Sequence, residues 1–201
     1  MARNKTPYNG NIVAGALLVR ESRIIARLLL DHADEKAWRQ AIVIDNVLQK
    51  RSPETAKRQA RLIKERLTLM EPELWRLIDK GSSDVVAQAL LAASIKHSRL
   101  LGDFMDKVVQ SHWRVFKKRL SNKDWEDYLE TRVQIDPHIE TWTESTRSKL
   151  RQIIFRIFVE AKYVNNTRSL ELLPVSLVPD VKIYLLNYSE DYVLTCMEMT
   201  P

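Results

Sequence analysis

A mostly helical fold is predicted from three features of the sequence. Only 4 Gly and 7 Pro occur in 201 residues, so few positions break helices. Apolar residues recur at helical spacing through most of the chain, and capping residues precede several of these runs. Because 45% of the residues are hydrophobic and 29% are charged, we expect a buried core and exclude disorder for most of the chain.

The first expected helix covers two apolar runs between residues 12 and 30. Arg20, Glu21, Arg23 and Arg27 interrupt these runs. A membrane-spanning helix needs about 20 consecutive apolar residues, so the segment indicates a buried amphipathic helix and no membrane contact. A secretory signal is not expected, and a single cysteine cannot form an internal disulfide. The sequence therefore favours a cytoplasmic protein.

Residues 35–70 show the pattern of a helix-turn-helix. One helix is expected over residues 35–50, a tight turn follows, and a second helix is expected over residues 53–70. Ser52 is a favourable N-cap, and Pro53 suits the first helical position. On the second helix an apolar stripe and a basic stripe lie on separate faces.

Five more helices are expected before residue 164. They cover residues of about 72–80, 85–101, 103–119, 122–132 and 143–163. The Ala- and Leu-rich helix over 85–101 is apolar over much of its circumference, so we expect it to lie centrally. In the next helix, the spacing of Trp113 and Phe116 places both side chains on the inner face.

The end of the chain has a different composition. Residues 170–179 contain β-branched residues and two prolines, which predict a short edge strand or an extended arm. Residues 180–198 predict a helix followed by a short helix or strand. We therefore expect an N-terminal helical bundle over residues 1–110 and a C-terminal helical subdomain over residues 111–201.

Positive charge concentrated on the helix over 53–70 is the main functional signal. The chain carries a net charge of +6, and residues 50–66 contain seven cations and two anions. Like charges three or four residues apart on one helix face repel one another, and a phosphate backbone would relieve that repulsion. A solvated helix face without a partner is the alternative. The predicted nucleic-acid-binding residues are Lys50, Arg51, Thr55, Lys57, Arg58, Arg61, Lys64 and Arg66.

A secondary basic patch is expected elsewhere on the surface. Basic and aromatic side chains together can bind single-stranded nucleic acid, but Trp113 and Phe116 are expected in the core. Residues 165–201 contain two cations and five anions, so we do not expect them to face nucleic acid. The residues of this secondary patch are Arg114, Lys117, Lys118, Arg119, Lys123, Arg147, Lys149 and Arg151.

No catalytic, metal or cofactor site is predicted. The four histidines lie at positions 32, 97, 112 and 138, without the spacing of a metal site and without partner cysteines. No glycine-rich phosphate loop occurs, and Cys196 has no histidine close to it in the sequence. We therefore expect a protein that is not an enzyme.

Short signatures are spread over nearly the whole chain. They are Glu21, Ile25-Ala26, Leu28-Leu29-Leu30, Trp38, Ile44-Asp45-Asn46-Val47-Leu48, Ser52-Pro53, Thr55-Ala56-Lys57-Arg58, Trp75, Ile78, Lys96, Ser98-Arg99-Leu100-Leu101-Gly102-Asp103-Phe104, Trp142, Ser145-Thr146 and Lys149-Leu150. Together they resemble one known family, BrxA of the bacterial BREX bacteriophage-exclusion systems. The resemblance implies an all-helical, NusB-like multi-helix bundle and a nucleic-acid-binding accessory role beside methyltransferase, ATPase and phosphatase-like components. It supplies no catalytic residue.

Charge pattern and resemblance together predict a non-catalytic accessory protein that binds double-stranded DNA in a BREX phage-defence system. Other BREX components are further expected partners. Asn46, Thr55 and Gln59 have donors and acceptors that suit base edges. Two alternatives stay open: an adaptor whose basic face docks an acidic partner subunit, and a NusB-like RNA-binding protein.

Overall fold

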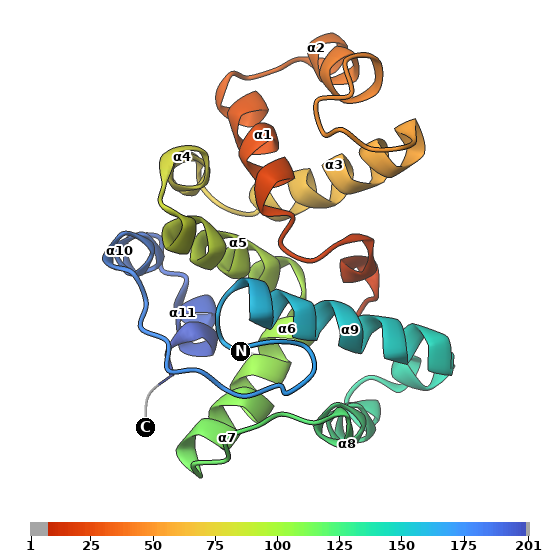
Figure 1. Ribbon diagram of the computed structural model, residues 1–201, viewed down its shortest axis with the longest axis vertical. Helices are drawn as coiled ribbons and strands as arrows, with labels where there is room; N and C mark the ends of the chain where they lie inside the picture. Colours follow the sequence, from red (N-terminus) through yellow and green to blue (C-terminus); the bar gives the residue numbers. More distant parts are fainter. Residues whose placement is uncertain (1–7, 200–201) are drawn as a thin grey trace.

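Helices make up almost all of the regular structure (Figure 1). The computed structural model describes residues 8–199, and within them no sheet forms. Only two isolated β-bridges occur in this range, Arg119 with Glu171 and Val164 with Leu172. The all-helical class predicted from the sequence is confirmed.

The first part of the chain forms one end of the molecule, at the top of Figure 1. A 3-10 turn is followed by α1, and α2 continues directly into a π-helical turn before a loop leads to α3. Asp34 caps α2 and Ser52 caps α3 by accepting backbone N–H bonds. The elements are η1 (Asn11–Ala14), α1 (Val19–Leu30), α2 (Glu35–Arg39), η2 (Gln40–Ile44) and α3 (Pro53–Leu67).

The middle of the chain contains the central helix. Helix α5 is buried without interruption from Val85 to Ile95, which confirms the central position expected for it. Ser82 and Ser98 cap α5 and α6. The elements of this part are α4 (Pro72–Lys80), α5 (Ser83–His97), α6 (Arg99–Phe104), η3 (Met105–Val109) and α7 (Gln110–Arg114).

The last part packs around α6 and covers the lower half of the molecule (Figure 1). Phe104 of α6 meets Trp125 and Tyr128 of α8 and Phe158 of α9, with ring centroids 5.1–6.0 Å apart. This aromatic cluster holds three helices together. The elements are α8 (Asn122–Val133), η4 (Pro137–Thr141), α9 (Glu144–Glu160), α10 (Pro179–Asn187) and α11 (Asp191–Met197).

The single helix expected over residues 12–30 is wrong. The segment forms two elements, η1 and α1, separated by a break. Leu18 at the break has a left-handed backbone with φ of 53°. A Cβ on Gly15 would lie 2.6 Å from the Leu18 side chain, so a larger residue there would require that side chain to move. Arg66 donates to the carbonyls of Gly15 and Ala16, and Glu160 accepts from the N–H of Leu17. These contacts satisfy backbone groups that a continuous helix would have paired.

The helix expected over 35–50 ends at Ile44, and the predicted tight turn is an eight-residue loop over 45–52. Asn46 has a left-handed backbone with φ of 46°, and its side chain accepts from the N–H of Lys50 and donates to the Lys50 carbonyl at 2.9 Å each. Leu48 is fully buried. The loop is therefore closed by an asparagine and anchored in the core.

The helix expected over 103–119 also ends early, at Arg114. Phe116, expected in the core, is 85% exposed, whereas Trp113 is half-buried and packs against the core. Residues 170–178 contain no helix and only bridge residues, in agreement with an extended arm, and two helices follow as predicted. The division into residues 1–110 and 111–201 stays a prediction. None of the helices within residues 8–199 is long and apolar enough to cross a membrane.

Candidate nucleic-acid interface

Helix α3 has two clearly different sides. Ser52 Oγ accepts from the N–H of Thr55 at 3.3 Å, and Pro53 occupies the first turn. The start of the helix is therefore fixed by its cap, as predicted. The buried side packs into the core and consists of Ala56, Ala60, Leu62, Ile63 and Leu67 together with Arg66.

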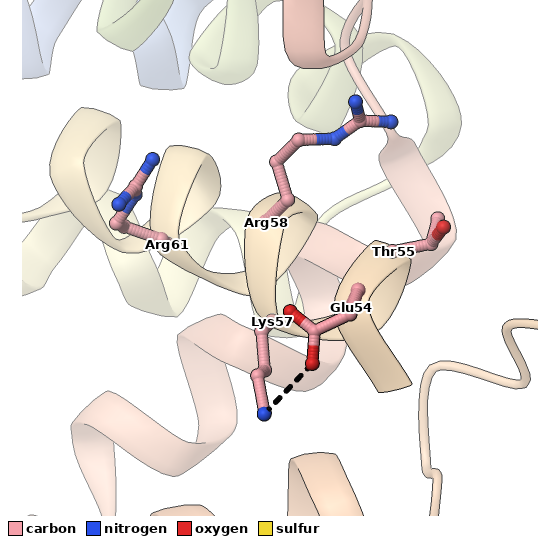
Figure 2. A pocket seen from close by; sticks show the side chains of 5 residues that line it. All are labelled: Glu54, Thr55, Lys57, Arg58 and Arg61. Carbon is pink, nitrogen blue, oxygen red and sulfur yellow. Dashed lines mark hydrogen bonds and ion pairs between the residues drawn. The ribbon is translucent and has the colours of Figure 1, made fainter. Parts of the chain in front are cut away.

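The opposite side carries four exposed cations, Lys57, Arg58, Arg61 and Lys64, which we call the α3 basic face. An open hollow of about 470 Å³ lies against Lys57, Arg58, Arg61, Glu54 and Thr55. Figure 2 shows Arg58 and Arg61 extending away from the helix on one side, whereas Lys57 points the other way, toward Glu54. Four of the eight predicted residues therefore lie exposed on the solvent side of α3.

The ion pairs on this face are weak. Lys57 Nζ lies 3.0 Å from Glu54 Oε1, and Arg61 Nε lies 3.8 Å from Glu65 Oε1. The side chains of Lys57 and Arg61 are 52% and 76% exposed. Exposed pairs of this kind contribute about 0.5 kcal/mol, and salt screens them. Both cations therefore remain available to an anionic partner.

Lys64 is oriented by an aromatic ring. Its Nζ lies 4.5 Å from the centroid of Trp38, which belongs to α2. This cation–π contact places the ammonium group beside α2 while leaving Lys64 exposed. Sequence reasoning missed Trp38 as a partner of the basic face, because 26 residues separate the two side chains and only the fold brings them together.

Lys50 is a structural cation. Its Nζ is hydrogen-bonded to the carboxylate of Glu21 in α1, and the Lys50 side chain is only 19% exposed. Burial alone would raise the pKa of Glu21, but the hydrogen bond from Lys50, a backbone hydrogen bond and the charges of Lys50 and Arg20 together lower that pKa. The pair ties the loop before α3 to α1. Lys50 therefore helps to position α3, and its support of phosphate binding stays a prediction.

Arg66 does not belong to the interface, which corrects its predicted role. The residue is 2% exposed, and its guanidinium donates to the carbonyls of Gly15 and Ala16. Burial lowers the pKa of Arg66 to about 10, and the charge of Glu160 opposes that shift. A phosphate cannot reach this side chain. Its predicted contact is incompatible with the structure because the helix turns position 66 toward the core.

The remaining polar residues of the prediction have mixed positions. Arg51 is exposed beside the α3 cap. Thr55 is half-buried, and its Oγ1 accepts from Ser52 Oγ at 3.0 Å. Of the residues with suitable groups for base edges, Asn46 uses its side chain to close the loop. Gln59 holds its Oε1 in a buried position without a hydrogen-bond partner among the described residues.

Half of the eight cations of the predicted secondary basic patch are engaged within the protein. Lys117 pairs with Asp124 at 2.7 Å, and Lys123 pairs with Asp127 at 2.9 Å. Arg151 donates to Glu126, and Arg147 donates to the carbonyl of Ile139. The cations of this set that are exposed and form no ion pair within 4.0 Å among residues 8–199 are Arg114, Lys118, Arg119 and Lys149.

Residues 8–199 contain no group of three His, Cys, Asp or Glu side chains that could hold a metal ion. Cys196 is buried, and burial raises the pKa of its thiol to about 12. That shift keeps the thiol protonated, so the cysteine behaves as a core residue.

Comparison with known proteins agrees with the fold. A family model described as BrxA matches residues 6–188. The chain belongs to the BrxA family. It is 45% identical to the BREX protein BrxA of Paramagnetospirillum magneticum, over 96% of this chain and 97% of that protein. It is 33% identical to the BREX protein BrxA of Escherichia coli, over 98% and 93% of the two chains.

A solved structure has the same architecture. The crystal structure of an uncharacterized protein from Magnetospirillum magneticum matches with a TM-score of 0.90 and 42% identity, and the match covers 97% of this chain and all of the other. The family resemblance predicted from the short sequence signatures is therefore confirmed.

Proposed function

We propose that this chain is a non-catalytic, double-stranded DNA-binding component of a BREX phage-defence system. Membership of the BrxA family supports the BREX assignment. The observation that supports DNA binding most strongly is the α3 basic face, where four exposed cations project from one capped helix whose other side is fixed in the core.

The dimensions of this face suit duplex DNA. A rise of 1.5 Å per residue places Lys57 and Lys64 about 10 Å apart along the helix axis, comparable to the rise of about three base pairs. The major groove is about 12 Å wide and admits an α-helix, whose basic side chains then reach the flanking phosphates. Thr55 and Arg51 near the start of α3 extend the surface that would face the duplex.

Two other partners explain the same charge. An acidic subunit of the BREX system would also neutralise the α3 basic face, and an RNA duplex offers phosphates as well. The predicted NusB-like architecture would favour RNA only by analogy of fold. The three proposals differ in what the purified chain binds and in how salt affects that binding.

The test compares duplex DNA, single-stranded DNA and duplex RNA of one length by fluorescence anisotropy at 50 and 200 mM salt. Each neutralised phosphate of duplex DNA contributes about −0.9 to the slope of log affinity against log salt, so four contacts predict a slope near −4. Duplex DNA should bind most tightly and lose about 100-fold in affinity between the two salt concentrations. Equal or tighter binding of RNA would support the RNA alternative. Failure to bind all three would support the adaptor.

The non-catalytic part of the proposal is tested separately. Purified chain with Mg²⁺ should neither cut DNA nor hydrolyse nucleotides, since its sequence has no phosphate loop and its described residues hold no metal-binding cluster. Turnover that persists through purification and disappears on a single substitution would contradict it.

A further inference from the structure

The end of α7 exposes two apolar side chains side by side. Val115 is 68% exposed, and Phe116, at 85%, is the most exposed large apolar residue among residues 8–199. This segment lies at the opposite end of the molecule from α3 (Figure 1). Single exposed apolar residues are common, so exposure alone does not indicate a partner.

Phe116 occupies a position that normally belongs to glycine. Its backbone is left-handed with φ of 57°. The N–H of Phe116 donates to the carbonyl of Trp113 at 3.1 Å, and the N–H of Lys117 donates to the carbonyl of His112 at 2.9 Å. These two bonds form a Schellman motif, in which the left-handed residue is usually Gly because a side chain there is strained. The same motif ends three other helices on non-glycine residues, His32, Lys162 and Ser189, but only at Phe116 does it present a large apolar side chain.

An apolar hollow lies beside the ring. It measures about 310 Å³, and Trp113, Phe116, Leu172 and the stems of Lys117 and Lys118 line it. Leu172 comes from the extended arm, and its N–H donates to the carbonyl of Lys118 at 2.9 Å. The hollow is therefore built from two distant segments that backbone hydrogen bonds hold together.

Unpaired positive charge flanks the lining residues of this hollow along the chain. Arg114, Lys118 and Arg119 are exposed, and none has a carboxylate within 4.0 Å among residues 8–199. Arg114 donates only to Gln110 Oε1, at 3.1 Å. Lys117 is different, because Asp124 already neutralises it. We call Phe116, its hollow and these three unpaired cations the α7 docking surface.

We propose that the α7 docking surface binds a short acidic segment of a partner protein. One large apolar side chain of that segment fills the hollow between Trp113, Phe116 and Leu172, and carboxylates on either side of it pair with Arg114, Lys118 and Arg119. Exposed aromatic side chains near arginines are the residue types that dominate binding at protein interfaces.

The same chemistry fits single-stranded nucleic acid less well. Such ligands need successive aromatic platforms along a basic groove, and here one exposed ring adjoins a single half-open apolar hollow. An aliphatic or aromatic side chain from a peptide fits that hollow, whereas a base would leave its polar edges against apolar walls. The proposal does not depend on DNA binding by α3.

The experiment selects peptides from a random phage-displayed dodecapeptide library on the immobilised full-length chain, with counter-selection on Phe116→Gly. This variant removes the ring and relieves the backbone strain, so it should fold at least as well as the parent. Enriched peptides should contain Trp, Phe, Leu or Met flanked by at least two Asp or Glu. Synthetic copies should bind the parent and lose at least tenfold in affinity on Phe116→Gly and on Lys118→Glu with Arg119→Glu.

Matched controls keep the outcome specific. Ile183→Ser removes an apolar side chain that is also more than half exposed, and Lys80→Glu with Lys149→Glu reverses the same charge elsewhere. Both should leave peptide binding unchanged, as should Lys57→Glu with Arg61→Glu and Lys64→Glu. Three results would overturn the proposal. The library could yield no peptides that prefer the parent to Phe116→Gly, or the enriched peptides could lack acidic residues. A twenty-nucleotide oligo-dT probe could also bind in a Phe116-dependent way while no peptide does.

Discussion

The α3 basic face and the α7 docking surface have the same sign of charge and differ in everything else. On α3, four cations share one helix with the exposed carboxylates of Glu54 and Glu65. At the end of α7, three unpaired cations accompany an apolar hollow and an exposed ring. Positive charge attracts anions in both places, but only the α7 docking surface can bury an apolar group of a partner. The comparison teaches that the residues between the cations indicate the class of partner.

Arg66 is the buried cation of α3, in contrast to the exposed cations of the α3 basic face, and its substitution should have the largest effect on stability. Arg66→Met should lower the free energy of unfolding by about 3 kcal/mol, because the carbonyls of Gly15 and Ala16 lose their donor in a buried site. Urea unfolding measures this loss. Arg58→Met is the control, an exposed cation of the same helix, and should cost less than about 0.5 kcal/mol. If Arg66→Met instead left stability unchanged and reduced the salt dependence of DNA binding, Arg66 would be a DNA contact.

Charge reversal separates the two basic surfaces. Replacing Lys57, Arg61 and Lys64 by Glu should weaken duplex DNA binding by more than about 100-fold at low salt, through lost contacts and added repulsion, while circular dichroism stays unchanged. The same reversal at Arg114, Lys118 and Arg119 should weaken it only a few-fold. Anisotropy titration compares the two. Equal losses, or no loss from the first triple, would place the DNA site elsewhere, with Lys149 as the next exposed candidate.

The ion pair of Asp124 with Lys117 is expected to stabilise the fold, which would set Lys117 apart from the unpaired cations of the α7 docking surface. Burial alone would raise the pKa of Asp124, but hydrogen bonds from Lys117 and Ser121 lower it to about 2. Its carboxylate accepts from the Ser121 N–H and hydroxyl at 2.7 Å each, which caps α8. Asp124→Asn should cost about 1–2 kcal/mol at neutral pH.

The pH dependence of this effect has a defined sign. Because the folded pKa of Asp124 lies below its usual value of 3.8, its contribution is complete above about pH 4 and is lost as the pH falls toward 2. Urea unfolding at several pH values should show a flatter acid limb for Asp124→Asn than for the parent. Asp127→Asn, at an exposed pair with Lys123, should leave that limb unchanged. Parallel acid limbs in parent and Asp124→Asn would contradict this account.

Phe116→Gly has the smallest expected effect on stability, and its sign is unusual. Relief of the left-handed strain should raise the free energy of unfolding by about 0.5–1 kcal/mol, after the entropic cost of glycine. Thermal unfolding measures the change. Phe116→Ala keeps the strain and should not raise stability. A loss of stability in the glycine variant would show that the ring packs against the fold and is not held out for a partner.

Local pattern predicted most of α3 and little of what surrounds it. The stripe through Ala56 and Ala60 and the cations at 57 and 61 follow from helical periodicity, and Ser52 is recognisable as a cap. The burial of Arg66 depends on carbonyls 50 residues away, which no local pattern records. Phe116 was placed in the core because its spacing from Trp113 is helical. The helix ends before it without the glycine that usually marks such an end.

Helix α3 is fastened at both ends, by Lys50 to Glu21 just before its cap and by Arg66 to Gly15 and Ala16 at its last turn. Its conformational entropy is therefore already lost when the chain folds. A ligand that meets the basic face orders only the tips of flexible side chains, and one of these, Lys64, already rests on Trp38. Preorganisation of this kind lets a small number of ionic contacts support binding, because little of their free energy is spent on arranging the backbone.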